Sequence, residues 1–148
     1  MLLGDDDTPV LMDFGSVKAA RVSISSRTEA LLLQEDAAQN CSMPYRAPEL
    51  FDVPSDASID ERTDVFSLGA TLYAMAYYYS PFECTFQDNT QRVVECSHLR
   101  VIGGPQFPTE RGYSDAFVAL IQWMLTIDPA ERPTVHQVLG KLRQMRGQ

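Results

Sequence analysis

Cysteine and basic residues are scarce in this 148-residue chain, and each scarcity excludes a class of protein. The three cysteines are odd in number, widely spaced and without histidines at metal-ligand spacing, which argues against a disulfide framework or a zinc site and favours a reducing compartment. Because 12 Lys and Arg stand against 20 Asp and Glu, the net charge of -8 argues against nucleic acid as a partner. We therefore expect a cytoplasmic protein.

The most apolar stretch, residues 64–79, predicts a buried helix at the centre of the fold. Its side chains are apolar on every side, so no polar stripe is wide enough to face water. The alternative, a membrane span, is disfavoured because the stretch is short, contains Ser67, Gly69 and Thr71, and lacks flanking basic residues. With 45% hydrophobic residues, the chain is long enough for one soluble globular domain around this helix.

Two short apolar segments near the start of the chain predict a β-hairpin. Residues 1–3 and 10–12 flank a turn rich in Gly, Asp and Pro. The motif Asp13-Phe14-Gly15 follows the second segment directly. An Asp-x-Gly motif at the end of a strand is often only a turn, so this motif gains meaning only from the residues that follow it.

Three further features follow the Asp13-Phe14-Gly15 motif along the chain. Residues 44–49, Pro-Tyr-Arg-Ala-Pro-Glu, are separated from it by the length of a mobile loop, and the apolar helix comes next. Residues 124–134 form a third distinctive motif near the end of the chain. In this order the chain resembles the C-terminal lobe of a eukaryotic protein kinase, where the first two motifs bracket the activation segment. The resemblance covers essentially the whole chain.

The resemblance implies a mainly α (α+β) fold like that of a kinase C-terminal lobe. This lobe would combine a short N-terminal β-hairpin with a buried central helix. The implied partial protein kinase domain spans residues 1–146, with an activation segment at 13–49 and a helical scaffold at 63–146.

Several groups that phosphoryl transfer needs have no counterpart in this sequence. Kinases of this family use a glycine-rich phosphate cover, a lysine paired with a glutamate, a general-base Asp and a second-metal Asn. These groups, and with them the N-terminal lobe and catalytic loop, would lie upstream of Met1, so we expect the chain alone to be inactive. Without that lobe an apolar face around Leu2, Val10 and Phe14 would be exposed, which predicts self-association.

The implied function is that of a serine/threonine protein kinase, which transfers the γ-phosphate of ATP to hydroxyls of a protein substrate. By the resemblance, Asp13 binds Mg2+ against the phosphates of ATP, since this hard cation prefers oxygen ligands. Phe14 would pack inward, and Gly15 would give the backbone the freedom to swing Asp13. Leu2 would lie under the adenine ring, although an ordinary core leucine is an equal alternative.

Residues 41–45 match the loop that docks the protein substrate in such kinases. Ser42 matches the hydroxyl that hydrogen-bonds the catalytic base in serine/threonine kinases, and Tyr45 belongs to the same substrate-docking loop. This match favours Ser or Thr over Tyr as the acceptor, with dual specificity left open. Cys41 is expected to be a small buried residue rather than a reactive thiol, because no adjacent base would lower its pKa.

Hydroxyls between residues 16 and 40 are candidate phosphorylation sites. A phosphate there would add about two negative charges near Arg21, Arg27 or Arg46 and could order the loop. A solvated loop that is never modified is the alternative for this polar composition.

By the same resemblance, Glu49 and Arg132 form a buried ion pair although they are far apart in the sequence. A bidentate contact between a guanidinium and a carboxylate explains why lysine would not replace this arginine. Asp64, at the start of the apolar helix, would hold the catalytic loop and accept backbone N–H groups.

The link at residues 50–63 is longer than is usual in the family, which predicts an extra helix similar to that of the numb-associated kinases. Residues 31–39, 45–51 and 59–65 resemble the branch of myristoylated and palmitoylated serine/threonine kinases. Membrane association would depend on a region upstream of Met1, and no transmembrane segment is predicted. The alternative function is a non-catalytic, kinase-derived interaction module.

The second half of the chain predicts three more helices. Residues 90–99 form a short amphipathic segment, and Ser114 is the expected N-cap of a helix over 115–125. Thr134 is the expected N-cap of a last helix over 135–146.

Overall fold

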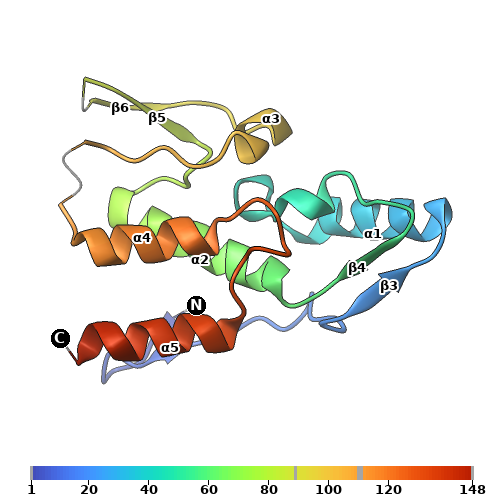
Figure 1. Cartoon of the computed structure of the whole chain (residues 1–148), viewed down its shortest axis with the longest axis horizontal. Helices are drawn as coiled ribbons and strands as arrows, with labels where there is room; N and C mark the ends of the chain where they lie inside the picture. The colour runs from blue at the N-terminus through green and yellow to red at the C-terminus, as the bar shows by residue number, and fades with distance from the viewer. Residues whose placement is uncertain (1, 89, 110–111, 148) are drawn as a thin grey trace.

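The computed structural model of the chain describes residues 2–88, 90–109 and 112–147, without the side chains of Leu2 and Leu3 (Figure 1). The elements follow in the order β1 (Leu2–Leu3), β2 (Pro9–Val10), β3 (Val22–Ile24), α1 (Arg27–Asn40), η1 (Met43–Tyr45), η2 (Pro48–Leu50), β4 (Ala57–Ile59), α2 (Arg62–Tyr77), β5 (Cys84–Gln87), β6 (Thr90–Val93), α3 (His98–Ile102), α4 (Asp115–Met124) and α5 (Val135–Arg146). Within the described residues, the strands pair as antiparallel ribbons β1–β2, β3–β4 and β5–β6. The predicted mainly α fold with an N-terminal hairpin is confirmed.

Helix α2 lies at the centre of the molecule and packs against α4 and η1 (Figure 1). Its buried side includes Phe66 and Tyr73, but Asp64, Leu68 and Met75 are exposed, and Met75 keeps 65% of its surface. The prediction that this helix is wrapped on every side is therefore wrong: neighbouring elements leave one stripe open to solvent. No described helix combines the length and apolarity needed to cross a membrane.

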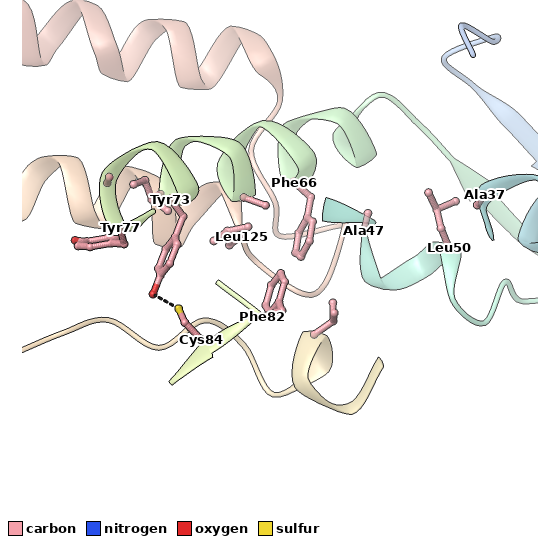
Figure 2. Close-up of a cluster of buried hydrophobic side chains, with 13 residues drawn as sticks. Ala37, Ala47, Leu50, Phe66, Tyr73, Tyr77, Phe82, Cys84 and Leu125 are labelled. Carbon is pink, nitrogen blue, oxygen red and sulfur yellow. Dashed lines mark hydrogen bonds between the residues drawn. The ribbon is translucent and has the colours of Figure 1, made fainter. Parts of the chain in front are cut away.

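The largest hydrophobic core cluster packs against the buried side of α2 (Figure 2). Phe66 stacks on Phe82 with ring centroids 5.8 Å apart, which joins α2 to the chain that leads into β5. Helix α4 approaches closely at Gly69, where an added Cβ would lie only 2.9 Å from the Cβ of Met124. A side chain at this position would push the two helices apart, so the glycine sets their separation.

The two predicted caps are confirmed. The Ser114 hydroxyl accepts a hydrogen bond from the Phe117 N–H and begins α4, and Thr134 and Gln137 form a reciprocal capping box that begins α5. The helix predicted over residues 90–99 is wrong. Its first half is strand β6, because these residues pair with β5 in a hairpin, and the helix α3 begins only at His98.

The extra helix predicted for residues 50–63 is also wrong, since that link carries strand β4 between η2 and α2. Strand β4 pairs with β3, which lies more than thirty residues earlier: Val22 faces Ile59 and Ile24 faces Ala57. The additional helix lies instead in the expected loop. There α1 begins at Arg27, after the N-cap Ser26, whose hydroxyl accepts a hydrogen bond from the Glu29 N–H. Strand β3 and helix α1 thus both lie in the segment that the sequence predicted to be a loop.

Candidate substrate-docking and metal-binding site

A buried ion pair anchors the loop that leads to α2. Arg132 is 2% exposed, and its Nη1 and Nη2 lie 2.7 and 2.8 Å from the two carboxylate oxygens of Glu49, 83 residues away in sequence. Arg132 also donates to the carbonyls of Arg62, Thr126 and Ile127. Every guanidinium nitrogen therefore has a partner, which offsets the cost of burying the charge. The predicted pairing is present.

The predicted substrate-docking loop lies directly on α2. Tyr45 ends η1, and its carbonyl accepts a hydrogen bond of 2.9 Å from the Ser67 hydroxyl of α2. Ser42 is the residue before η1, is exposed, and makes no capping hydrogen bond with its side chain. The loop is therefore fixed at Tyr45, while the Ser42 hydroxyl faces solvent. Burial, with a smaller contribution from Glu83, raises the pKa of the Tyr45 phenol, so this side chain stays neutral.

The sequence did not reveal the role of Arg46. This side chain is buried, and its Nη2 donates to the Cys41 carbonyl at 2.7 Å and to the Ala38 carbonyl at 3.3 Å. Its guanidinium lies over the Phe51 ring, and the other neighbour of that ring is the parallel imidazole of His98 at 4.7 Å. Arg46 thus ties the docking loop to the end of α1 and to α3. Its Nε and Nη2 are thus bound to backbone carbonyls, and contact of Arg46 with a phosphate stays a prediction.

The motif Asp13-Phe14-Gly15 lies in an exposed part of the chain. Phe14 is 63% exposed, so the prediction that it packs inward is wrong; the described residues offer no apolar site that buries it. Asp13, rather than Gly15, adopts a positive φ of 64°, and its Oδ1 accepts a hydrogen bond from the Gly15 N–H at 3.3 Å. The backbone turn at Asp13 is therefore local, and the Asp13 carboxylate faces solvent.

Asp13 fits one position of a magnesium site but not a complete one. Its exposed carboxylate is the hard oxygen ligand that Mg2+ prefers. Among the described residues, no group of three Asp, Glu, His or Cys side chains is close enough to hold a metal. The remaining ligands would be water, phosphate oxygens or other protein groups. The side chain of Leu2, the predicted adenine contact, lies outside the described part of the chain.

Asp64 does not cap α2. The helix begins two residues earlier, at Arg62. The Glu61 side chain makes no capping hydrogen bond, and the Asp60 Oδ1 accepts one from the Arg62 N–H at 2.9 Å. Asp64 is exposed in the first turn, where a carboxylate still suits the positive end of the helix dipole. Asp64 therefore does not serve as the N-cap of α2, because it lies inside the first turn rather than before it. Its predicted role of holding the catalytic loop through backbone N–H groups stays a prediction.

Two exposed ion pairs connect the start of the activation segment to the rest of the molecule. Lys18 pairs with Asp36 of α1, and Arg21 donates from Nε and Nη2 to both oxygens of Glu61 at 3.1 Å. Hydrogen bonding from Arg21 lowers the pKa of Glu61 to about 2, so Glu61 is charged at neutral pH. Arg21 is therefore already paired with a carboxylate.

The three cysteines are free thiols. Cys41 and Cys96 are half-buried, and burial is the main cause that raises the pKa of both thiols. Cys84 is buried, 3.7 Å from the Tyr73 hydroxyl (Figure 2). Cys41 accordingly lacks the depressed pKa of a reactive thiol, as its sequence neighbours predicted.

Comparisons with known proteins identify the family. The protein kinase domain family matches residues 1–142. A probable serine/threonine-protein kinase of Dictyostelium discoideum is 46% identical over 140 residues, which cover 93% of this chain and 37% of that relative. Serine/threonine-protein kinase 16 of Homo sapiens and that of Mus musculus are each 42% identical over 145 residues, which cover 98% of this chain and 46% of each relative. The chain thus spans less than half the length of these relatives, and over nearly all of its own length it belongs to the protein kinase family.

Proposed function

We propose that this chain forms the substrate-docking part of a serine/threonine protein kinase, which transfers the γ-phosphate of ATP to serine or threonine hydroxyls of a protein substrate. The observation that carries the proposal is the buried Glu49–Arg132 pair beneath the docking loop. This pair fixes the distance between η2 and the start of α2, and Ser67 of α2 holds Tyr45 in turn. These contacts would hold in place the loop that carries the Ser42 hydroxyl.

The proposed roles divide between two segments. Ser42 would form a hydrogen bond with the general base that acts on the acceptor hydroxyl of the substrate. Tyr45 would hold the docking loop in place. Asp13 would hold Mg2+, which supplies positive charge against the phosphates of ATP. Leu2 would contact the adenine ring, and Gly15 would allow Asp13 to move. The general base and the phosphate-binding lysine are not among these 148 residues, so we propose that this polypeptide alone does not transfer phosphate.

The assignment to a branch rests on sequence similarity alone. The relatives carry the name serine/threonine-protein kinase, and we propose that this chain belongs to the branch of myristoylated and palmitoylated serine/threonine kinases within the numb-associated kinases. We also propose a cytoplasmic protein, peripheral to membranes through acylation of another region. Protein kinases in general use ATP and Mg2+, and these are the cofactors that we propose here.

The test compares this chain with a longer product. Transcripts would be sequenced upstream of Met1, and any longer open frame expressed beside the 148-residue chain. We expect Mg2+-dependent phosphorylation of a serine- and threonine-containing protein mixture by the longer product and none by the 148-residue chain. In the longer product Asp13→Asn should abolish transfer, and Ser42→Ala should reduce it by about tenfold or more.

A matched control isolates the role of Asp13. Asp7 is also exposed and also has a positive φ, of 60°, but it lies in the β1–β2 turn. Asp7→Asn removes the same charge and should leave transfer unchanged. Activity of the Asp13→Asn protein equal to that of Asp7→Asn would contradict the assignment of Asp13, and phosphorylation of tyrosine alone would contradict the assignment of Ser42.

A second function is favoured by the exposed apolar side chains of residues 10–17 and of the α2 stripe. These side chains suit a kinase-derived interaction module, which would bind a partner without catalysis. A genuine stop codon upstream of Met1, together with a partner that protects Phe14 and Met75 from solvent, would support the module. A longer active product would contradict it.

A further inference from the structure

A cavity of about 580 Å3 lies between the β5–β6 hairpin and the chain at residues 106–109. Its described lining comprises two aromatic and three polar residues: Phe86, Asp88, Gln106, Phe107 and Thr109. The docking loop and the Asp13 motif contribute none of these residues. The proposed kinase function therefore leaves this cavity unexplained, and its volume is in the range of sites that bind small molecules or side chains.

The aromatic wall is held in place by the core. Phe107 meets Tyr73 and Tyr77 edge to face, with ring centroids 5.1 and 6.1 Å apart. The Tyr73 hydroxyl donates a hydrogen bond to the Gln106 carbonyl, which fixes the backbone beside the ring. Phe86 is half-buried against the same core. Both rings are thus positioned before any ligand arrives, which lowers the entropic cost of binding.

The polar wall carries a negative charge. Asp88 is exposed and is the charged residue among the described residues that line the cavity. Arg92 does not neutralise it: Arg92 faces Thr85 across the hairpin, and side chains alternate along a strand, so Arg92 projects from the face opposite to Phe86. Two phenyl rings and a carboxylate in one lining, in a chain of net charge -8, favour a cationic ligand.

We propose that this cavity binds an arginine side chain from an extended segment of a protein partner. The planar guanidinium suits the two phenyl rings, because it stacks on aromatic faces and is weakly hydrated. The Asp88 carboxylate accepts two parallel hydrogen bonds from it, and the exposed Gln106 side chain contacts the neighbouring peptide groups. Lysine lacks the planar fork and would bind more weakly. The inference goes beyond the proposed function, since it requires neither ATP nor the docking loop.

Fluorescence anisotropy of a labelled peptide tests the proposal with the whole 148-residue chain. The probe is a seven-residue Gly/Ser peptide with a central arginine, and its matched partner has citrulline, the neutral isostere, at that position. We expect the arginine peptide to bind about tenfold or more tightly than the citrulline peptide, and the difference to shrink as salt is raised.

Asp88→Asn is the informative variant. Asp88 has a φ of 50°, and Asn accepts this left-handed conformation, so the hairpin turn is retained. The variant should lose about fivefold or more in affinity for the arginine peptide. Asp7→Asn, the equivalent change in the β1–β2 turn, alters net charge identically and should leave affinity within about twofold. Phe86→Leu keeps an apolar side chain, removes a ring face and should also weaken binding.

Circular dichroism would establish that each variant is folded. Equal affinity of the Asp88→Asn and Asp7→Asn proteins, equal affinity for the arginine and citrulline peptides, or no binding of the arginine peptide at about 1 mM would each overturn the proposal. Amide chemical-shift changes confined to β5 and residues 106–109 would support it, whereas changes confined to residues 41–49 would overturn it.

Discussion

Residues 5–21 and the helical body around α2 differ in the burial of their apolar side chains. Every residue of 5–21 is exposed, including Leu11 at 71% and Phe14, whereas α2 and α4 bury Phe66 and Met124 completely. Surface ion pairs join the first region to the second. The docking half of the site is therefore held by contacts within this chain. The segment that carries Asp13 makes no such buried contacts within the part of the chain that the structure describes.

The largest expected effect concerns the anchor of the body. Glu49→Ala removes the partner of Arg132 and leaves a buried guanidinium unpaired, which should lower the free energy of unfolding by about 3–5 kcal/mol. Urea denaturation measures the loss. Glu61→Ala is the control, because it breaks the exposed pair with Arg21 and should shift the midpoint far less. Similar losses in both variants would contradict the contrast between the body and residues 5–21.

A smaller effect tests the contact between α2 and α4. Gly69→Ala places a Cβ 2.9 Å from Met124 and 3.2 Å from Leu125, and should destabilise the protein by about 1–3 kcal/mol through overpacking. Gly140→Ala in α5 is the matched control, since no atom lies within 4 Å of an added Cβ there. That change should stabilise the helix by about 0.5–1 kcal/mol. A stable Gly69→Ala protein would show that the helices can separate freely.

Polar substitutions in residues 5–21 should change association rather than stability. The double variant Leu11→Ser and Phe14→Ser alters exposed side chains, so the unfolding free energy should stay within about 0.5 kcal/mol of the original. Sedimentation velocity should show less self-association, because exposed apolar surface is removed. The control is Leu31→Ser with Leu32→Ser, which changes two exposed leucines of α1, outside residues 5–21, and should leave self-association unchanged. An original chain that is already monomeric at high concentration would refute the prediction.

The smallest effect concerns the Arg21–Glu61 pair that connects the two regions. The folded pKa of Glu61, about 2, lies below its ordinary value of 4.5. The pair therefore favours folding above pH 4.5, and this contribution is lost as the pH falls from 4.5 toward 2. The unfolding midpoint of the original protein should approach that of Glu61→Gln over this interval, and added salt should reduce the difference. A constant difference at all pH values would count against this linkage.

Local patterns predicted some features well, and the reason is physical. Ser114 and Thr134 cap helices through hydrogen bonds to residues three positions away, so each cap is visible in a few consecutive letters. The β1–β2 hairpin likewise follows from its turn. The Glu49–Arg132 pair was predicted only through the resemblance to kinases, because no local rule joins residues 83 positions apart.

Other features could not be predicted from local patterns. The pairing of β3 with β4 turned an expected helix into a strand. The structural contacts of Arg46 were not foreseen, because its carbonyl partners and the Phe51 ring come together only in the folded chain. Phe14 was expected to be buried, but burial depends on whether another element covers a side chain, which its own sequence neighbours do not reveal. The cavity beside Asp88 is likewise formed by two segments that meet in space.

The sequence by itself determined the family, the acidic charge, the capped helices α4 and α5, and the apolar core of α2, because motifs, composition and periodicity are properties of neighbouring residues. The tertiary structure alone decided which side of α2 stays open, that Arg46 is buried against the Ala38 and Cys41 carbonyls, and that Phe86, Phe107 and Asp88 share a cavity. These outcomes depend on distances between residues remote in the chain, and such distances are fixed only when the helices and hairpins pack.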